Sequence, residues 1–268
     1  STSTAEIFRM KNNLRTTVRS NLLRWRGSIL KRFNVRKVRT PYGSVSMVAR
    51  WDDATFRFIA KGLYGFQYSS YISSKNSPFI FVDIGANQGL YTLLAAENPF
   101  CRAVFAFEPV STTFEWLKTN VELSEFASKI RPYQSAVGDT DCKMDIVLGQ
   151  GHSGVATLRS MGEVETSNFA KEKINCLSVD SVARLLSEFS GVQIAVKIDV
   201  EGFEPVVISS LIEADFFLNI TSIYFEVDEN WWDPRDILEV LGSHGFERVL
   251  TNHGVHPTHY DVLYTRGI

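Results

Sequence analysis

The chain has 268 residues, of which 44% are hydrophobic and 22% charged, a composition typical of a globular protein with a sizeable core. No stretch reaches the ~18 consecutive apolar residues that a membrane-spanning helix requires, which excludes an integral membrane protein. The three cysteines are too few and too scattered for a disulfide framework or a cysteine zinc site, so we expect a reducing, cytoplasmic setting.

Residues 1–40 form a basic arm. They contain eleven Lys or Arg and one Glu, a net charge of +10, whereas residues 41–268 contain 17 basic and 29 acidic residues and carry −12. Apolar residues recur in the arm at steps of three or four, which predicts a long amphipathic helix. This apolar stripe consists of Ile7, Met10, Leu14, Val18, Leu22, Trp25, Ile29 and Phe33.

The arm fits several roles. We favour packing of the stripe on the acidic body or on a second subunit as a homodimer. The alternative is an interfacial helix that lies on anionic lipid, because basic residues opposite Trp, Phe and Leu suit that environment. An organellar transit segment is a weaker third role, since it would not belong to a mature chain. We expect no nucleic-acid partner, because the acidic body would repel phosphate.

The rest of the chain divides into a small cap (41–78) and a body (79–268). The cap has one short strand and a helical stretch over 52–63. In the body, apolar runs alternate with amphipathic helices, which predicts an α/β fold with a mostly parallel sheet. A short turn separates the last two runs, which predicts an antiparallel final hairpin. The seven predicted strands are 79–84, 102–107, 130–137, 193–199, 222–227, 246–250 and 260–265.

A glycine turn follows the first of these strands. Residues 83–89 read DIGANQG, the pattern D-x-G-x-x-x-G, and lead directly into a predicted helix. Glycines at a helix start let a ligand approach the backbone closely. The dinucleotide fingerprint G-x-G-x-x-G and the phosphate loop G-x-x-x-x-G-K-[ST] do not match. The turn alone therefore predicts a ligand site without identifying the ligand.

The next two strands also end in candidate ligand residues. Glu108 lies 23 residues after Gly85, about the spacing at which such folds place a carboxylate for ribose hydroxyls. The third strand ends in SAVGD (135–139), whose small residues and acid suit a flat slot for an adenine ring. Because ligands of doubly wound sheets bind at the carboxyl ends of the strands, these features together indicate a nucleoside site.

The fourth strand ends in KIDVEGFE (197–204). The period-two rule of β-strands places Lys197, Asp199 and Glu201 on one side. A Lys between two acids at the ligand end of the sheet indicates charges that tune one another. A structural ion pair at the sheet edge is the alternative interpretation.

Taken together, these motifs closely resemble those of the FkbM family of S-adenosylmethionine-dependent methyltransferases, in matching order over roughly residues 79–250. The motifs are VDIGANQG, FEP, NV at 120–121, SAVGD, LSVD and KIDVEGFE. The resemblance implies a class I methyltransferase (Rossmann-like) fold with helices on both faces of the sheet. It also implies O-methylation of a hydroxylated small molecule or glycan, with S-adenosylmethionine as cofactor.

The resemblance further implies roles for individual residues. The methionine part of the cofactor would be held by Asp83, Gly85, Asn87 and Gly89. Glu108 would take the ribose. The adenine would be lined by Ala136 and Val137, with Ser135 and Asp139 nearby. Asp199 would face the cofactor amino group or the acceptor.

For the reaction itself we hypothesise that Asp199 or Glu201 takes the proton of the acceptor hydroxyl, while Lys197 sets the local charge. Second choices are His152 and Glu226. A metal-assisted alternative would use Asp199, Glu226 and Asp228 as oxygen ligands of Mg²⁺. We favour hydrogen-bonded acids over that metal site and expect no metal.

Two further alternatives concern the acceptor and the class of protein. Base methylation is not expected, because no Asn/Asp-Pro-Pro-aromatic segment follows the fourth strand. Aromatic side chains such as Tyr64 and Tyr68 could instead stack on sugar rings. A non-catalytic S-adenosylmethionine-binding or scaffold protein, which uses the basic helix to hold a partner or a membrane, is the alternative to an enzyme.

Overall fold

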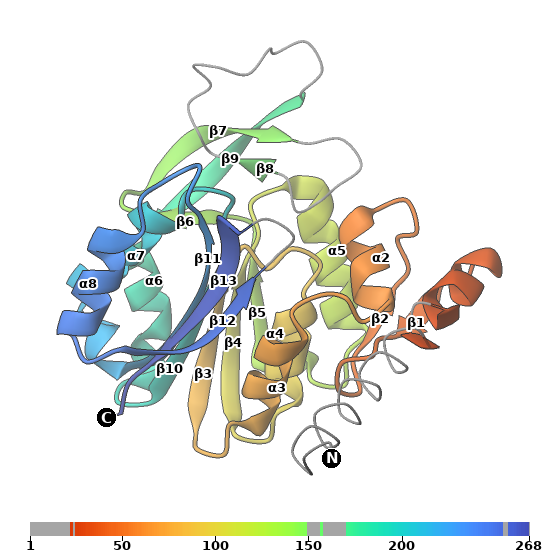
Figure 1. Ribbon diagram of the computed structural model, residues 1–268, viewed down its shortest axis with the longest axis horizontal. Helices are drawn as coiled ribbons and strands as arrows, with labels where there is room; N and C mark the ends of the chain where they lie inside the picture. The colour runs from red at the N-terminus through yellow and green to blue at the C-terminus, as the bar shows by residue number, and fades with distance from the viewer. Residues whose placement is uncertain (1–21, 24, 149–155, 158–169, 254–256, 268) are drawn as a thin grey trace, which may run out of the picture.

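The computed structural model describes residues 22–23, 25–148, 156–157, 170–253 and 257–267. Its centre is a seven-stranded sheet with the order β12-β13-β11-β10-β3-β4-β5 (Figure 1). The five strands from β11 to β5 pair in parallel, and β13 runs antiparallel to both of its neighbours, β11 and β12. The predicted α/β fold with its antiparallel final hairpin is therefore confirmed. The strands are β3 (Phe79–Ile84), β4 (Cys101–Phe107), β5 (Ile130–Tyr133), β10 (Gln193–Ile198), β11 (Ile220–Asp228), β12 (Glu247–His253) and β13 (His259–Thr265).

Helices cover both faces of this sheet. Along β3, Phe79 and Phe81 join one hydrophobic cluster while Ile80 and Val82 join the other, because successive side chains point to opposite faces. Burial on both faces explains why the parallel strands read as continuous apolar runs. The first face is covered by α3 (Phe66–Ser74), α4 (Leu90–Glu97) and α5 (Ser111–Glu122), and the second by α6 (Val179–Leu186), α7 (Glu204–Glu213) and α8 (Arg235–Ser243).

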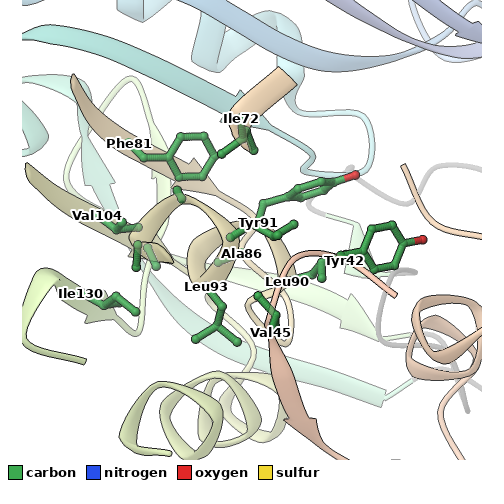
Figure 2. Close-up of a cluster of buried hydrophobic side chains, with 14 of the residues drawn as sticks. Tyr42, Val45, Ile72, Phe81, Ala86, Leu90, Tyr91, Leu93, Val104 and Ile130 are labelled. Carbon is green, nitrogen blue, oxygen red and sulfur yellow. The ribbon is translucent and has the colours of Figure 1, made fainter. Parts of the chain in front are cut away.

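The core of the first face centres on α4. Figure 2 shows Leu90, Tyr91 and Leu93 of this helix among buried side chains that include Phe81 of β3 and Val45 of the N-terminal part. All of α4 except its last residue is buried. A helix that is buried on every side holds the glycine turn before it in one place.

A second, four-stranded sheet with the order β6-β9-β7-β8 lies over the carboxyl end of the main sheet (Figure 1). Its strands are β6 (Ala136–Gly138), β7 (Cys142–Leu148), β8 (Ala156–Thr157) and β9 (Ala170–Ser178). The single strand predicted over 130–137 is wrong, since the chain leaves the main sheet after Tyr133. Ser135 Oγ donates to the carbonyl of Asn175, and β6 then pairs with β9.

The N-terminal part forms a cap beside the first face. It contains a helical segment over 25–32, a two-stranded sheet of β1 (Lys37–Arg39) and β2 (Ser46–Val48), and α2 (Ala54–Ala60). The arm predicted as helical over 1–40 therefore ends in a strand. Short 3₁₀ helices occur at η1 (Ala127–Lys129), η3 (Ser187–Phe189) and η4 (Asp215–Asn219). Among the described residues, no helix has the length and apolar character to cross a membrane.

Two polar side chains connect this cap to the glycine turn. Asp53 Oδ1 caps α2 by accepting from the Phe56 amide at 2.8 Å and also accepts from Gln88 Nε2 at 2.6 Å. Asn120 of α5 accepts from the Val48 amide and donates to the carbonyl of Gln88. The cap is thus fixed to the turn that the sequence singles out as a ligand site.

The described part of the apolar stripe does not pack on the body, which is one of the two favoured placements. Its four described residues are exposed rather than packed on the body. Leu30, which is outside the stripe, packs against the first core cluster instead. The exposed stripe residues are Leu22, Trp25, Ile29 and Phe33.

Candidate functional site

A cavity of about 420 Å³ opens at the carboxyl ends of β3, β4, β10 and β11. This volume lies within the range of small-molecule sites. Both sheets and the cap contribute to its lining, including Ala136 of β6, Ile146 of β7 and Leu63, Tyr64 and Gly65 after α2. The cap, which lies outside the resemblance, therefore forms part of the wall.

One end of the cavity is apolar. Val110, Ala136 and Ile146 line it, and the three belong to a separate hydrophobic cluster with Ile174 and Cys176 of β9. An apolar surface of small and branched side chains suits a flat ring such as adenine.

Glu108 follows β4 next to this apolar end. Its side chain is buried, and its two carboxylate oxygens accept from the backbone amides of Asn87 at 2.9 Å and Val110 at 3.0 Å. Burial raises the pKa of Glu108 to about 7, although these two amides oppose the rise. The carboxyl lines the cavity, where it can accept further hydrogen bonds from a diol.

The glycine turn brings the backbone close to the neighbouring strand end. Gly85 has a φ of +76°, and a Cβ added there would collide with the carbonyl oxygen of Asp199. The amides of Gly85 and Ala86 both donate to the carbonyl of Phe107. The Asn87 backbone has a φ of +50°, which directs its amide to Glu108. The turn therefore joins β3, β4 and β10 within one short segment.

The other end of the cavity is acidic. Asp199, Glu201 and Glu226 each place a carboxylate oxygen there, and these three oxygens lie within 4.8 Å of one another. Glu201 sits in a left-handed conformation with a φ of +52°. Burial, together with Glu226 and Asp199, raises the pKa of Glu201 to about 10, so its carboxyl is protonated at neutral pH.

The turn that carries Glu201 is held by Glu204. The two carboxylate oxygens of this buried residue accept from the amides of Val200 and Gly202, each at 2.9 Å. Burial raises the pKa of Glu204 to about 8, although the hydrogen bonds from the backbone oppose the rise. The final Glu of KIDVEGFE thus positions the acidic residues rather than facing the cavity.

Lys197 lies behind the acidic end. Its buried ammonium group is 3.3 Å from Asp199 and 3.5 Å from Asp83, and it donates to the carbonyl of Gly85 at 2.6 Å. Burial alone would lower the pKa of Lys197, but Asp199 and Asp83 outweigh it and keep the pKa above its ordinary value. Lys197 thus pairs with Asp83, which is buried, and with Asp199, which lines the cavity.

The last strand contributes cavity residues that sequence reasoning missed. His259, Tyr260 and Asp261 of β13 line the cavity, because β13 pairs with β11 and places Asp261 opposite Glu226. Only this long-range pairing brings them to the site, so no local pattern could have identified them. Tyr64, noted as a possible sugar-stacking residue, does line the cavity, whereas Tyr68 is buried against Tyr224.

The structure separates the predicted site residues into two groups. The cavity is lined by Gly85, Asn87, Glu108, Ala136, Asp199 and Glu201. The other predicted site residues are not among those that line it, namely Asp83, Gly89, Ser135, Val137, Asp139 and Lys197. Asp83 accepts from Thr92 at 2.6 Å, and Gly89 is the N-cap of α4, so both support the turn. The second-choice base His152 lies outside the described residues.

The hypothetical metal ligands are grouped differently from the prediction. The cluster contains Glu201 in place of Asp228, whose Oδ1 accepts from the amide and side chain of Asn230. Three carboxylates could offer oxygen ligands to a divalent cation. The three carboxyls can also lie this close together without a cation, because Glu201 is protonated and Glu226 contacts His259.

Comparison with known proteins identifies the chain's relatives. The family model of the methyltransferase FkbM domain matches residues 83–248. Methyltransferase 1 of Beauveria bassiana (strain ARSEF 2860) is 27% identical over 188 residues, which cover 62% of this chain and 71% of that protein.

Solved structures with a similar fold have low sequence identity. A methyltransferase FkbM from Methylobacillus flagellatus KT has a TM-score of 0.48 and 13% identity, covering 95% of this chain and 60% of that one. The human methyltransferase 10 domain containing protein has a TM-score of 0.43 and 12% identity, and the match covers 76% of this chain and 82% of that one. TrmK of M. capricolum, solved with S-adenosyl-homocysteine, has a TM-score of 0.43 and 11% identity, and the match covers 75% of this chain and 68% of that one.

The cavity suits the cofactor that the resemblance implies. Its apolar end fits an adenine ring, Glu108 can accept from two ribose hydroxyls, and Gly85 and Asn87 line the cavity beside Asp199, where the methionine part would lie. Since the family model matches more than half of the chain, the chain belongs to the FkbM methyltransferase family and uses S-adenosylmethionine as its methyl donor.

Proposed function

We propose that the chain transfers a methyl group to a hydroxyl of a sugar, glycan, glycolipid or related natural product, with Asp199 as the base. The observation that carries this proposal is the acidic end of the cavity, which lies on the strands next to the proposed cofactor site. When bound, S-adenosylmethionine supplies a methyl group activated by a sulfonium.

The lining of the acidic end supports a polyhydroxylated acceptor. Tyr64 and Asn252 offer hydroxyl and amide groups there, and Glu226 and Asp261 offer acceptors. Such groups hydrogen-bond well to neighbouring hydroxyls. The carboxylates would repel a phosphorylated or carboxylated ligand, so we expect a neutral or cationic acceptor.

Of the two predicted bases, Asp199 suits the role better. The pKa of Glu201, raised to about 10, means that its carboxyl carries its own proton at neutral pH. Asp199 is 3.3 Å from the Lys197 ammonium group and 3.4 Å from the Tyr64 hydroxyl, which fix its position. Glu201 can instead donate a hydrogen bond to the acceptor or to Asp199.

In the proposed step, the acceptor oxygen forms a bond to the methyl carbon while the carbon–sulfur bond breaks. The electron pair of that bond would stay with the sulfur, and Asp199 would take the hydroxyl proton. Alignment of the two bound reactants can supply about 7 to 11 kcal/mol of the barrier. A positioned base adds about 10² to 10⁴-fold, so positioning is the larger effect.

Membership in a methyltransferase family favours an enzyme over a non-catalytic binding protein. An amine acceptor is the outcome to be distinguished by experiment, because a cationic amine would also suit carboxylates.

The test has two stages. Titration calorimetry with S-adenosylhomocysteine should show binding that Glu108→Ala weakens and Asp199→Asn largely preserves. Transfer of labelled methyl groups to a panel of neutral glycans, amino sugars and lipid-linked sugars then identifies the acceptor. We expect Asp199→Asn to lower turnover by about 10² to 10⁴-fold, while Asp215→Asn, at an exposed site on η4, leaves it unchanged.

Several results would contradict this assignment. Methyl transfer to an amine but to no hydroxyl would show that the acceptor is an amine and not a sugar hydroxyl. Unchanged turnover of Asp199→Asn with saturating cofactor would exclude that base. Loss of activity in excess chelator, restored by Mg²⁺, would favour the metal-assisted alternative over hydrogen-bonded acids.

A further inference from the structure

We propose that the N-terminal segment docks the protein on an anionic lipid surface. The docking face consists of Leu22, Trp25, Ile29 and Phe33, whose exposed fractions are 66%, 74%, 41% and 74%. Their spacing of three, four and four residues places them on one side of the helical segment over 25–32 and its flanks. Figure 1 shows this helix in red at the edge of the molecule, beside β1.

The docking face is directed outward by contacts on the other side of the helix. Leu30 packs against the first core cluster, and Gly27 lies close to Lys61 just after α2. Arg26 donates to the carbonyl of Arg39 at 2.6 Å, which ties the helix to β1. Among the described residues, the helix therefore has one side that contacts the protein and a second, apolar side, the docking face, that is exposed.

Charge indicates which partner this face fits. Residues 22–39 contain seven Lys or Arg and no Asp or Glu. Five of these basic residues are exposed, namely Lys31, Arg32, Arg36, Lys37 and Arg39. Exposed Trp and Phe surrounded by basic side chains are typical of a helix that lies in the headgroup region of anionic lipid. Because residues 41–268 carry −12, the membrane field would also turn the acidic body away.

A second copy of the chain fits this face less well. A symmetric dimer through the docking face would bring two uncompensated basic segments together, which like-charge repulsion disfavours. A head-to-tail contact between the basic segment and an acidic body would close only if the rotation between copies formed a ring, and it would pair the charges without burying the apolar docking face. An anionic lipid surface can bury the apolar residues and pair its headgroups with the basic residues at the same time.

The segment that carries the docking face also contacts the chain next to the cavity lining. Leu23, on the inner side of the segment, lies close to Gly62. The next residue, Leu63, lines the cavity and is 40% exposed. Docking would therefore hold the cavity opening close to the lipid headgroups.

The test is sedimentation of the full chain with vesicles. We expect binding to vesicles of equal parts phosphatidylcholine and phosphatidylglycerol, little binding to phosphatidylcholine alone, and weaker binding at high salt. Trp25→Ser with Phe33→Ser should reduce partitioning by roughly tenfold or more. Lys31→Glu and Arg32→Glu should each reduce it by about fivefold or more.

Matched controls separate docking from general surface effects. Leu218→Ser alters a side chain that is 74% exposed on η4, and Lys143→Glu alters an exposed charge on β7. Neither should change vesicle binding. All variants should bind S-adenosylhomocysteine as the unmodified chain does, which shows that they are folded.

Three outcomes would overturn the proposal. One is the absence of binding to anionic vesicles at low salt. Another is equal loss of binding in the Leu218→Ser or Lys143→Glu control. The third is a dimer in lipid-free solution, detected by light scattering, that the Trp25→Ser and Phe33→Ser pair abolishes, because the face would then belong to a second copy.

Discussion

His259 Nε2 lies 2.7 Å from Glu226 Oε1, and this contact joins the last strand to the acidic end of the cavity. The other ring nitrogen, Nδ1, is 3.5 Å from Asp228 Oδ2. The hydrogen bond to Glu226 is the main reason that the pKa of His259 rises to about 9, so the ring is an imidazolium at neutral pH. Among the described residues that line the cavity, it is the single basic side chain.

The first prediction is that His259→Gln impairs use of the acceptor and leaves the cofactor site intact. The change removes a cation, so Glu226 loses its ion-pair partner beside Asp199 and Glu201. Loss of a hydrogen bond between charged groups should lower kcat/KM for the acceptor by roughly tenfold to a hundredfold. Affinity for S-adenosylhomocysteine should change little, and His244→Gln, on the exposed end of α8, is the control. An equal loss of cofactor affinity would show that His259 acts on the whole cavity.

The second prediction concerns the pH dependence of stability at the same contact. Because the pKa of His259 is raised from 6.5 to about 9, its ion pair stabilises the fold fully below about pH 6.5. That stabilisation is lost as the pH rises through about 9, where the folded protein releases the proton. The difference in Tm between the unmodified chain and His259→Gln should therefore shrink between these pH values. A difference that stays constant would mean that the ring is neutral throughout.

The third prediction is that cofactor affinity rises with pH through the titration of Glu108. With its pKa raised to about 7, this carboxyl is largely protonated in slightly acidic solution, and a neutral carboxyl accepts the ribose hydroxyls less well. Affinity for S-adenosylhomocysteine should increase up to about tenfold between about pH 6 and pH 8. Glu108→Gln should flatten this dependence, whereas Glu115→Gln, on an exposed part of α5, should preserve it.

The parallel strands β3 and β4 were predictable because each is a largely apolar run followed by a helix. Glu108 and Asp199 were also predictable, since each directly follows such a run and so lies at the carboxyl edge of the sheet. The second sheet was not predictable from the sequence, because β6 has three residues and its partner β9 begins more than thirty residues later. His259 and Asp261 were missed for the same physical reason: antiparallel pairing of β13 with β11 brings them to the cavity, and pairing partners are not visible locally.

The fourth prediction tests the buried ion pair behind the cavity. Lys197→Met should lower the free energy of unfolding by about 3 to 5 kcal/mol, because Asp83 would remain buried without its cation. Urea unfolding measures this loss. Lys118→Met is the control, since its ion pair with Glu115 is largely exposed and should contribute at most about 1 kcal/mol. A small loss of unfolding free energy in Lys197→Met would mean that the Asp83 carboxyl is protonated and does not need the cation.

The fifth prediction compares two glycines with the same backbone conformation. Gly85 and Gly191 both have a φ of +76°, but an added Cβ meets the carbonyl oxygen of Asp199 at Gly85 and nothing within 4 Å at Gly191. Gly191→Ala should therefore cost only the left-handed strain of about 1 to 2 kcal/mol. Gly85→Ala carries the same strain and must also push apart the ends of β3 and β10, which displaces Asp199 from the cavity. We expect Gly85→Ala to lose S-adenosylhomocysteine binding and Gly191→Ala to retain it, as calorimetry would measure. Equal binding by both variants would show that the contact between the turn and Asp199 does not shape the cofactor site.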